Sequence, residues 1–232
     1  MKRTFDLNIE TVLENWTVAD AIREIIANAE DETIITGSKR VEIYKDKEGK
    51  WHIKDYGRDI RYQHFTQNES EEKLSRKDLI GKFGVGLKDA LATFHRHNVA
   101  VTINTKNSTI KTIITSKHGF SDIETLHAEI MEIDNLDIVG TDFVLENCSD
   151  EEMRKAQSNF IKYTSSELLQ ITRYGEVYKK TKPNEKSNIY VNGMKIAQED
   201  NFVFHYNITN INASIKKALN RENKCRKKCL YG

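Results

Sequence analysis

The chain has 232 residues, of which 38% are hydrophobic and 31% are charged. It carries 36 lysines and arginines against 35 aspartates and glutamates, so its formal net charge is only +1. This balance excludes the strongly basic composition of a dedicated nucleic-acid-binding domain, and the sequence shows no apolar run long enough to predict a membrane span.

The N-terminus and the cysteines together predict a cytoplasmic protein. Residues Met1–Asp6 lack the apolar stretch of a secretory signal. The cysteines Cys148, Cys225 and Cys229 form an odd, sparse set that makes a poor disulfide framework, which favours a reducing compartment. Cys225 and Cys229 have no histidine nearby, and a zinc site would need two more ligands, so we expect plain tail residues there.

The first predicted element is a helix from about Thr17 to Asp31. Thr17 stands at the N-cap and Asp20 at the capping-box position three residues later. The apolar residues that follow have helical spacing, namely Val18, Ile22, Ile25, Ile26 and Ala29. Two alternating segments come next, Val41–Tyr44 and Trp51–Lys54, which predict a pair of strands.

A second helix is predicted at Leu87–His95, followed by four strands at Val99–Asn104, Thr109–Thr115, Leu126–Ile133 and Val139–Glu146. A third helix is predicted at Ser149–Tyr163, followed by two strands at Asn188–Val191 and Phe202–Phe204 and a last helix at Asn210–Asn220. An Asn192-Gly193 turn predicts a hairpin after the first strand of the last pair. This order predicts an α+β fold, a two-layer α/β sandwich with helices over one face of a mixed sheet. We expect one domain over residues 1–165 and a C-terminal extension over residues 166–232.

A first polar motif lies on the first predicted helix, in Glu24-Ile25-Ile26-Ala27-Asn28. Glu24 and Asn28 are four residues apart, so they share one face of the helix. A carboxylate there can orient or deprotonate a water molecule, and an amide oxygen one turn later can bind Mg²⁺. A solvated polar face that also includes Asp20 and Asp31 is the competing interpretation.

A second motif follows the strand Trp51–Lys54, in Asp55-Tyr56-Gly57-Arg58-Asp59-Ile60. A carboxylate at the end of a strand can accept a hydrogen bond from the amino group of adenine. Gly57 then lets the backbone pass close to the base. An ordinary Asp-x-Gly turn is the competing interpretation.

A third motif is rich in glycine and leads into the second predicted helix, in Ile80-Gly81-Lys82-Phe83-Gly84-Val85-Gly86-Leu87-Lys88. Free backbone N–H groups and the helix dipole at a helix start suit phosphate oxygens. The motif is not a Walker A loop, because Leu87 stands where that loop needs lysine. It also lacks the strand and the third glycine of a dinucleotide fingerprint.

Taken together, the three motifs resemble the GHKL superfamily of ATPases, which share the Bergerat ATP-binding fold. That superfamily includes the ATPase component of DNA gyrase, the ninety-kilodalton heat-shock chaperone, MutL, MORC proteins and sensor histidine kinases. Its N-box is similar to Glu24–Asn28, its first glycine box to Asp55–Ile60, and its second to Gly81–Lys88. The resemblance extends over roughly Val12–Lys162 and implies ATP and Mg²⁺ as ligands.

The resemblance also implies a role for each matching residue. Glu24 would act as the general base, Asn28 would bind Mg²⁺, and Asp55 would receive the adenine amino group. A Gly140-Thr141 element resembles the one that places a threonine hydroxyl beside the adenine. The other implied nucleotide-binding positions are Gly57, Ile60, Gly81, Lys82, Phe83, Gly84, Val85, Gly86, Leu87 and Lys88.

The sequence departs from the superfamily pattern at one position of the first glycine box, and a polar segment follows that box. Asp59 stands where the first glycine box usually has a second glycine, although aspartate tolerates unusual backbone angles better than most residues. The polar stretch Arg61–Lys77 corresponds to the lid of the superfamily, and its low apolar content favours a segment that orders on binding.

Three functions are weighed on these grounds. The first is a slow ATPase whose lid closure drives a conformational or dimerisation switch, with a homodimer or a larger protein as partner. The others are a histidine-kinase-type catalytic domain and a nucleotide-binding interaction module that does not hydrolyse ATP. Lys182 and Lys195 are candidates for a γ-phosphate contact from the C-terminal extension. The basic run Arg221–Lys228 favours a solvated tail over a nucleic-acid contact.

Overall fold

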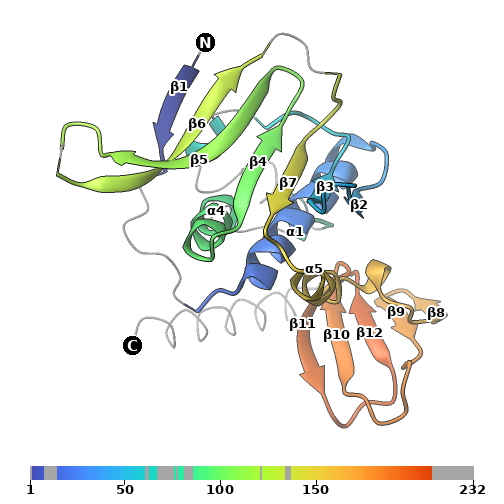
Figure 1. The fold of residues 1–232 in the computed structure, drawn as a ribbon. Coiled ribbons are helices and arrows are strands. Elements are labelled where there is room, and N and C mark those ends of the chain that lie inside the picture. The colour runs from blue at the N-terminus through green and yellow to red at the C-terminus, as the bar shows by residue number, and fades with distance from the viewer. Residues whose placement is uncertain are drawn as a thin grey trace. The chain divides into compact units, whose positions relative to one another are not determined.

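The computed structural model describes residues 2–7, 15–60, 63–66, 76, 78–80, 86–120, 122–133 and 137–210. The chain divides into two compact units, Met1–Asn159 and Phe160–Gly232. The division falls a few residues before the boundary expected at residue 165. Each unit has its own sheet (Figure 1).

Seven described strands of the first unit form one sheet in the order β1-β6-β5-β4-β7-β3-β2. All six neighbouring pairs are antiparallel. The expectation of a mixed sheet is therefore wrong for this region. Short connections such as the turn between β4 and β5 allow only antiparallel neighbours. The strands are β1 (Lys2–Asp6), β2 (Glu42–Lys45), β3 (Trp51–Lys54), β4 (Ala100–Asn104), β5 (Ser108–Ser116), β6 (Glu124–Glu132) and β7 (Asp142–Glu146).

Helix α1 (Val18–Thr36) lies at the centre of the first unit. It packs against α4 (Gly86–Arg96), α5 (Asp150–Gln157) and strand β3, while α4 packs against β4 (Figure 1). The helix α2 (Gln63–Thr66) is a single turn. The side of α1 turned to the core consists of small and branched apolar residues, including Val18, Ala21, Ile22, Ile25 and Ala29, which are all buried.

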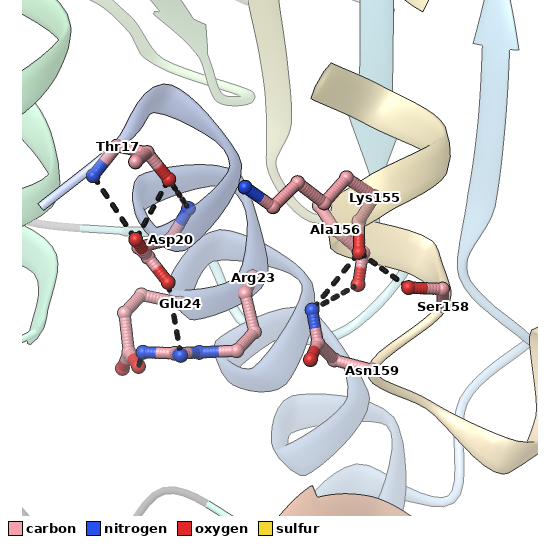
Figure 2. A network of polar contacts seen from close by, with 8 residues as sticks. All are labelled: Thr17, Asp20, Arg23, Glu24, Lys155, Ala156, Ser158 and Asn159. Atoms are coloured by element: carbon pink, nitrogen blue, oxygen red, sulfur yellow. Dashed lines mark hydrogen bonds and ion pairs between the residues drawn. The ribbon is translucent and has the colours of Figure 1, made fainter. Parts of the chain in front are cut away.

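The start of α1 is fixed by the capping box that the sequence predicts. The Thr17 hydroxyl oxygen accepts a hydrogen bond from the Asp20 N–H at 3.3 Å, and the Thr17 N–H donates to Asp20 Oδ2 at 3.0 Å (Figure 2). The helix runs beyond the expected end at Asp31 and stops at Thr36. Gly37 then adopts a left-handed conformation and donates its N–H to the Thr33 carbonyl. This extension brings Glu32 into the helix.

The second unit contains a five-stranded sheet among its described residues, in the order β11-β10-β12-β9-β8. Strands β10 and β12 are parallel and the other neighbours are antiparallel. The predicted Asn192-Gly193 hairpin is confirmed, because both residues have positive φ, 49° and 84°, as a two-residue hairpin turn requires. The strands are β8 (Leu168–Thr172), β9 (Gly175–Tyr178), β10 (Ser187–Val191), β11 (Met194–Glu199) and β12 (His205–Ile208).

Several predicted boundaries differ from the structure. The strand expected at Phe202–Phe204 is wrong, because β12 begins only at His205. The helix expected to run from Ser149 to Tyr163 ends at Gln157, and a 3-10 turn follows at Ile161–Tyr163. The sequence did not predict β1, β8 or β9. The helix expected at Asn210–Asn220 lies outside the described residues, apart from Asn210.

Among the helices that the structure describes, none is long and apolar enough to cross a membrane.

We predict that Thr17→Ala lowers the free energy of unfolding of the first unit by about 1 kcal/mol, because the N-cap acceptor is lost. Both tryptophans of the sequence, Trp16 and Trp51, belong to this unit, so urea denaturation followed by tryptophan fluorescence measures it. Thr17→Ser is the matched control and keeps the hydroxyl. Equal losses in both variants would contradict the capping role.

Candidate functional site

One face of α1 carries four acidic or amide side chains between Glu24 and Glu32. Glu24, Asn28, Asp31 and Glu32 are spaced by four, three and one residues, so they project from the same side of the helix. Asp31 is fully buried, and Glu24, Asn28 and Glu32 are partly buried. The interpretation of this face as merely solvated is therefore wrong for Asp31.

Glu24 lies against the start of α4. A Cβ atom placed on Gly86, the first residue of α4, would be 2.5 Å from Glu24 Oε2. The other carboxylate oxygen, Oε1, accepts a hydrogen bond from Arg23 Nη2 at 2.9 Å (Figure 2). The glycine thus lets the carboxylate approach a helix N-terminus, where the helix dipole stabilises negative charge, and Arg23 holds its orientation.

Asp31 fixes the other end of the glycine-rich segment. Its Oδ1 accepts a hydrogen bond from the Ile80 N–H at 2.6 Å, and the preceding Leu79 is 1% exposed. Ile80 and Gly86 flank residues 81–85, which lie outside the described residues. Helix α1 therefore contacts Ile80, immediately before the second glycine box, and Gly86, within that box.

Glu32 connects α1 to the first glycine box. Glu32 Oε1 accepts hydrogen bonds at 2.8 Å from both the backbone N–H and the Nε of Arg58. A Cβ atom on Gly57 would lie 2.4 Å from Glu32 Cγ. Only glycine allows this close approach without displacement of the Glu32 side chain. Gly57 is thus required by the contact with α1, whether or not a base binds beside it.

Asp55 is a buried carboxyl group immediately after β3. It is 5% exposed, and its Oδ1 accepts a hydrogen bond from the Gly57 N–H at 2.9 Å. Its own N–H donates to the Thr141 carbonyl at 2.9 Å. Gly140 has φ +76°, and a Cβ atom there would lie 2.3 Å from the Asp55 carbonyl oxygen. The Gly140-Thr141 element therefore packs directly on the backbone of Asp55.

Burial raises the pKa of Asp55 to about 7, because the ionised form loses its hydration. The negative charges of Glu32 and Asp59 raise it further, whereas the backbone N–H groups of Gly57 and Thr141 lower it. At neutral pH this carboxyl group is poised between its two protonation states. A ligand that donates a hydrogen bond to it would stabilise the carboxylate.

Thr141 joins the two parts of the first glycine box. It is fully buried, and its hydroxyl oxygen accepts a hydrogen bond from the Ile60 N–H at 3.3 Å. The antiparallel register of β3 and β7, with Lys54 opposite Asp142, sets Thr141 beside Asp55. Asp55, Ile60 and Thr141 are therefore brought together, although 81 positions of sequence separate Ile60 from Thr141.

The structure places some of the predicted site residues and leaves others undescribed. Glu24 and Asn28 lie on α1, and Gly86, Leu87 and Lys88 form the first turn of α4. The rest of the second glycine box lies outside the described residues, namely Gly81, Lys82, Phe83, Gly84 and Val85. The predicted lid, Arg61–Lys77, is described only at residues 63–66 and 76.

Sequence reasoning did not assign a role to Asp31, Glu32 or Gly140. The signal for Asp31 and Glu32 was present, because they lie seven and eight residues after Glu24 and so continue its helical face. The signal for Gly140 was its place before Thr141. None of these residues was assigned, because their partners, Ile80, Arg58 and Asp55, are far away in the sequence.

Comparison with known proteins gives a relative over nearly the whole chain. An uncharacterised protein of Mycoplasma pneumoniae is 39% identical over 227 residues, which cover 96% of this chain and 90% of that protein. The chain belongs to the same family as that protein. A family described as the Mycoplasma pneumoniae MPN635 N-terminal domain matches residues 151–231. A second uncharacterised protein of the same organism is 36% identical over 98 residues, 40% of this chain and 28% of that protein.

We predict that Asp55→Asn becomes more stable relative to the parent as pH rises from about 4 to about 7. The folded-state pKa of Asp55 is raised above its ordinary value, so the unfolded chain ionises first and the parent loses stability over this range. Each pKa unit corresponds to about 1.4 kcal/mol, which gives a relative gain on the order of 4 kcal/mol. Urea denaturation followed by tryptophan fluorescence measures it.

Asp46→Asn on the neighbouring turn is the control with the opposite sign. A backbone hydrogen bond from the Lys50 N–H lowers the pKa of Asp46, so this carboxylate stabilises the fold above its ordinary pKa, and that stability is lost as pH falls. The Asp46→Asn variant therefore becomes less stable relative to the parent as pH rises. The same pH trend in both variants would show that Asp55 does not have a raised pKa.

Proposed function

We propose that the first unit binds ATP with Mg²⁺ and hydrolyses it slowly, as a GHKL-type ATPase with a Bergerat fold. The observation that supports this most directly is the set of contacts made by one face of α1. Through Glu24, Asp31 and Glu32 this face contacts Gly86, Ile80 and Arg58, which belong to or border the two glycine boxes. Described residues of, or next to, three sequence-distant motifs thus lie in contact, as a common nucleotide site would require.

The adenine would bind at Asp55. The carboxyl group is buried, its pKa is raised to about 7, and the backbone of Gly57 is adjacent to it. The exocyclic amino group of adenine is a hydrogen-bond donor that would favour the ionised form. Thr141 accepts the Asp55 N–H through its carbonyl and the Ile60 N–H through its hydroxyl, so Thr141 and Ile60 would line the same side of the base.

The phosphates would lie between the second half of α1 and the start of α4. Backbone N–H groups at a helix N-terminus bind phosphate oxygens, and glycine allows their close approach. Lys88 in the first turn of α4 would add positive charge. Asn28 would offer one amide oxygen to Mg²⁺, whose other ligands would be phosphate oxygens and water. Bound Mg²⁺ would neutralise charge that develops on the phosphates.

Glu24 would position the attacking water. Its Oε1 is held by Arg23, and its Oε2 lies against the first turn of α4, so the carboxylate is oriented before any substrate arrives. A carboxylate in that place accepts a hydrogen bond from water and directs it at the γ-phosphorus. This arrangement favours hydrolysis over transfer to a histidine, in which a water-orienting carboxylate has no part.

Other parts of the sequence-based hypothesis stay predictions. They include closure of the Arg61–Lys77 segment as a lid, a nucleotide-dependent homodimer or larger protein partner, and a cytoplasmic location. Slow turnover follows from the first of these, because lid closure must come before chemistry.

We predict that Glu24→Gln lowers the rate of phosphate release at least a hundredfold and leaves ATP affinity within about threefold of the parent, since the carboxylate acts only on water. A coupled phosphate assay and calorimetric titration with ATP measure the two effects. Glu48→Gln on the exposed β2–β3 turn, with a side chain 72% exposed, is the control. Equal phosphate release from the parent and from Glu24→Gln would remove the proposed ATPase mechanism. Transfer of labelled phosphate to a histidine would favour the kinase alternative.

We predict that Asp55→Asn weakens ATP binding by about ten- to a hundredfold, because a hydrogen bond to a charged acceptor is worth about 1.5–3 kcal/mol. The parent should also prefer ATP to GTP, whose base presents an acceptor in place of the amino group. Calorimetric titrations at pH 8, above the pKa of Asp55, measure both affinities. Equal affinity of the parent for ATP and GTP would remove the adenine assignment.

A further inference from the structure

Strand β8 is an outer strand of the second unit's sheet. Among the described strands its neighbour is β9, with which it pairs antiparallel. All five residues of β8, Leu168–Thr172, are exposed. The outer edge of such a strand presents backbone N–H and C=O groups that another strand can pair with.

The composition of β8 differs from that of the other outer strands. Leu168, Leu169 and Ile171 are 44%, 45% and 70% exposed, and β8 contains no charged residue. Sheet edges are usually protected from pairing by charged side chains. Each of the other described outer strands carries such charges, Lys2, Arg3 and Asp6 on β1, Glu42 and Lys45 on β2, and Lys195 and Glu199 on β11. Only β8 among them lacks this protection.

The charges that flank β8 are opposite in sign and equally far from its centre. Glu167 precedes the strand and Arg173 follows it, each three positions from Gln170. If two copies of β8 pair antiparallel about Gln170, Leu169 of each copy faces Ile171 of the other, and Glu167 comes opposite Arg173, the first residue of the turn between β8 and β9. Opposite charges and apolar pairs across neighbouring strands stabilise a sheet. Parallel pairing would instead place each charge opposite its own sign.

The local structure leaves these groups available. Glu167 contacts Lys179 at 3.7 Å, but both side chains are about two-thirds exposed, and such pairs contribute little. Arg173 stacks over the Tyr174 ring at 4.5 Å, which keeps its charge at the end of β8. A bulge between Leu168 and Gln170 leaves Leu169 without a partner residue on β9.

We propose that β8 is a docking edge for a second copy of this chain. The two β8 strands pair antiparallel about a two-fold axis at Gln170 and join the second-unit sheets of both copies. The interface is isologous, since the same strand contributes from each side. This inference does not depend on ATP binding in the first unit.

The test measures dimerisation of the full chain by sedimentation velocity over a range of concentrations, without added nucleotide. Glu167→Arg and Arg173→Glu should each weaken dimerisation about tenfold, because each places like charges opposite one another at both ends of the pair. The double variant should restore the parent's dissociation constant. A parent that stays monomeric, or a double variant that is not rescued, overturns the proposal.

A second pair of variants separates strand pairing from nonspecific hydrophobic association. Ile171 and Val203 are both 70% exposed apolar residues of the second unit, and Val203 lies outside β8. Ile171→Lys should weaken dimerisation more than tenfold, whereas Val203→Lys should leave it unchanged. Equal weakening by both would mean that the copies associate through an apolar surface rather than through the β8 edge. Circular dichroism checks that each variant is folded.

Discussion

The arrangement of the first unit depends on the polar face of α1. Glu24, Asp31 and Glu32 reach Gly86, Ile80 and Arg58, while the opposite face of the helix is buried in the core. One rigid element thus sets the positions of chain segments that are far apart in sequence. Because a helix fixes the spacing of the side chains along one face, α1 holds Arg58 of the first glycine box, Ile80 and Gly86 at set positions relative to one another.

The same constraint explains the chemical character of Asp55. The contact of Glu32 with Gly57 and Arg58 closes one side of the first glycine box, and the Gly140-Thr141 element closes another. A carboxyl group in that space loses hydration, and the nearby charge of Glu32 adds to the cost of ionisation. A fold selected only for stability would gain by replacing such a group. A buried titratable group with a strongly shifted pKa is therefore a reason to look for a ligand there.

The sequence predicted the elements with strong local signals and failed where tertiary contacts decide. The Thr17 capping box and the Asn192-Gly193 turn are local, and both are confirmed. Phe202–Phe204 was predicted as a strand from its aromatic and branched residues, but the pairing with β9 begins at His205 and the pairing with β10 at Tyr206. In the site, residue types and spacing indicated Glu24 and Asp55. The roles of Asp31 and Glu32 depend on distant partners, which no local pattern reveals.

The two units differ in whether the outer strands of their sheets carry charged side chains. In the first unit both outer strands, β1 and β2, carry charged side chains, which oppose pairing with other chains. In the second unit β11 carries such charges and β8 does not. An unprotected strand is a liability unless its pairing is specific. The opposite charges of Glu167 and Arg173 on either side of β8 supply that specificity, because they favour one antiparallel register and disfavour pairing with unrelated strands.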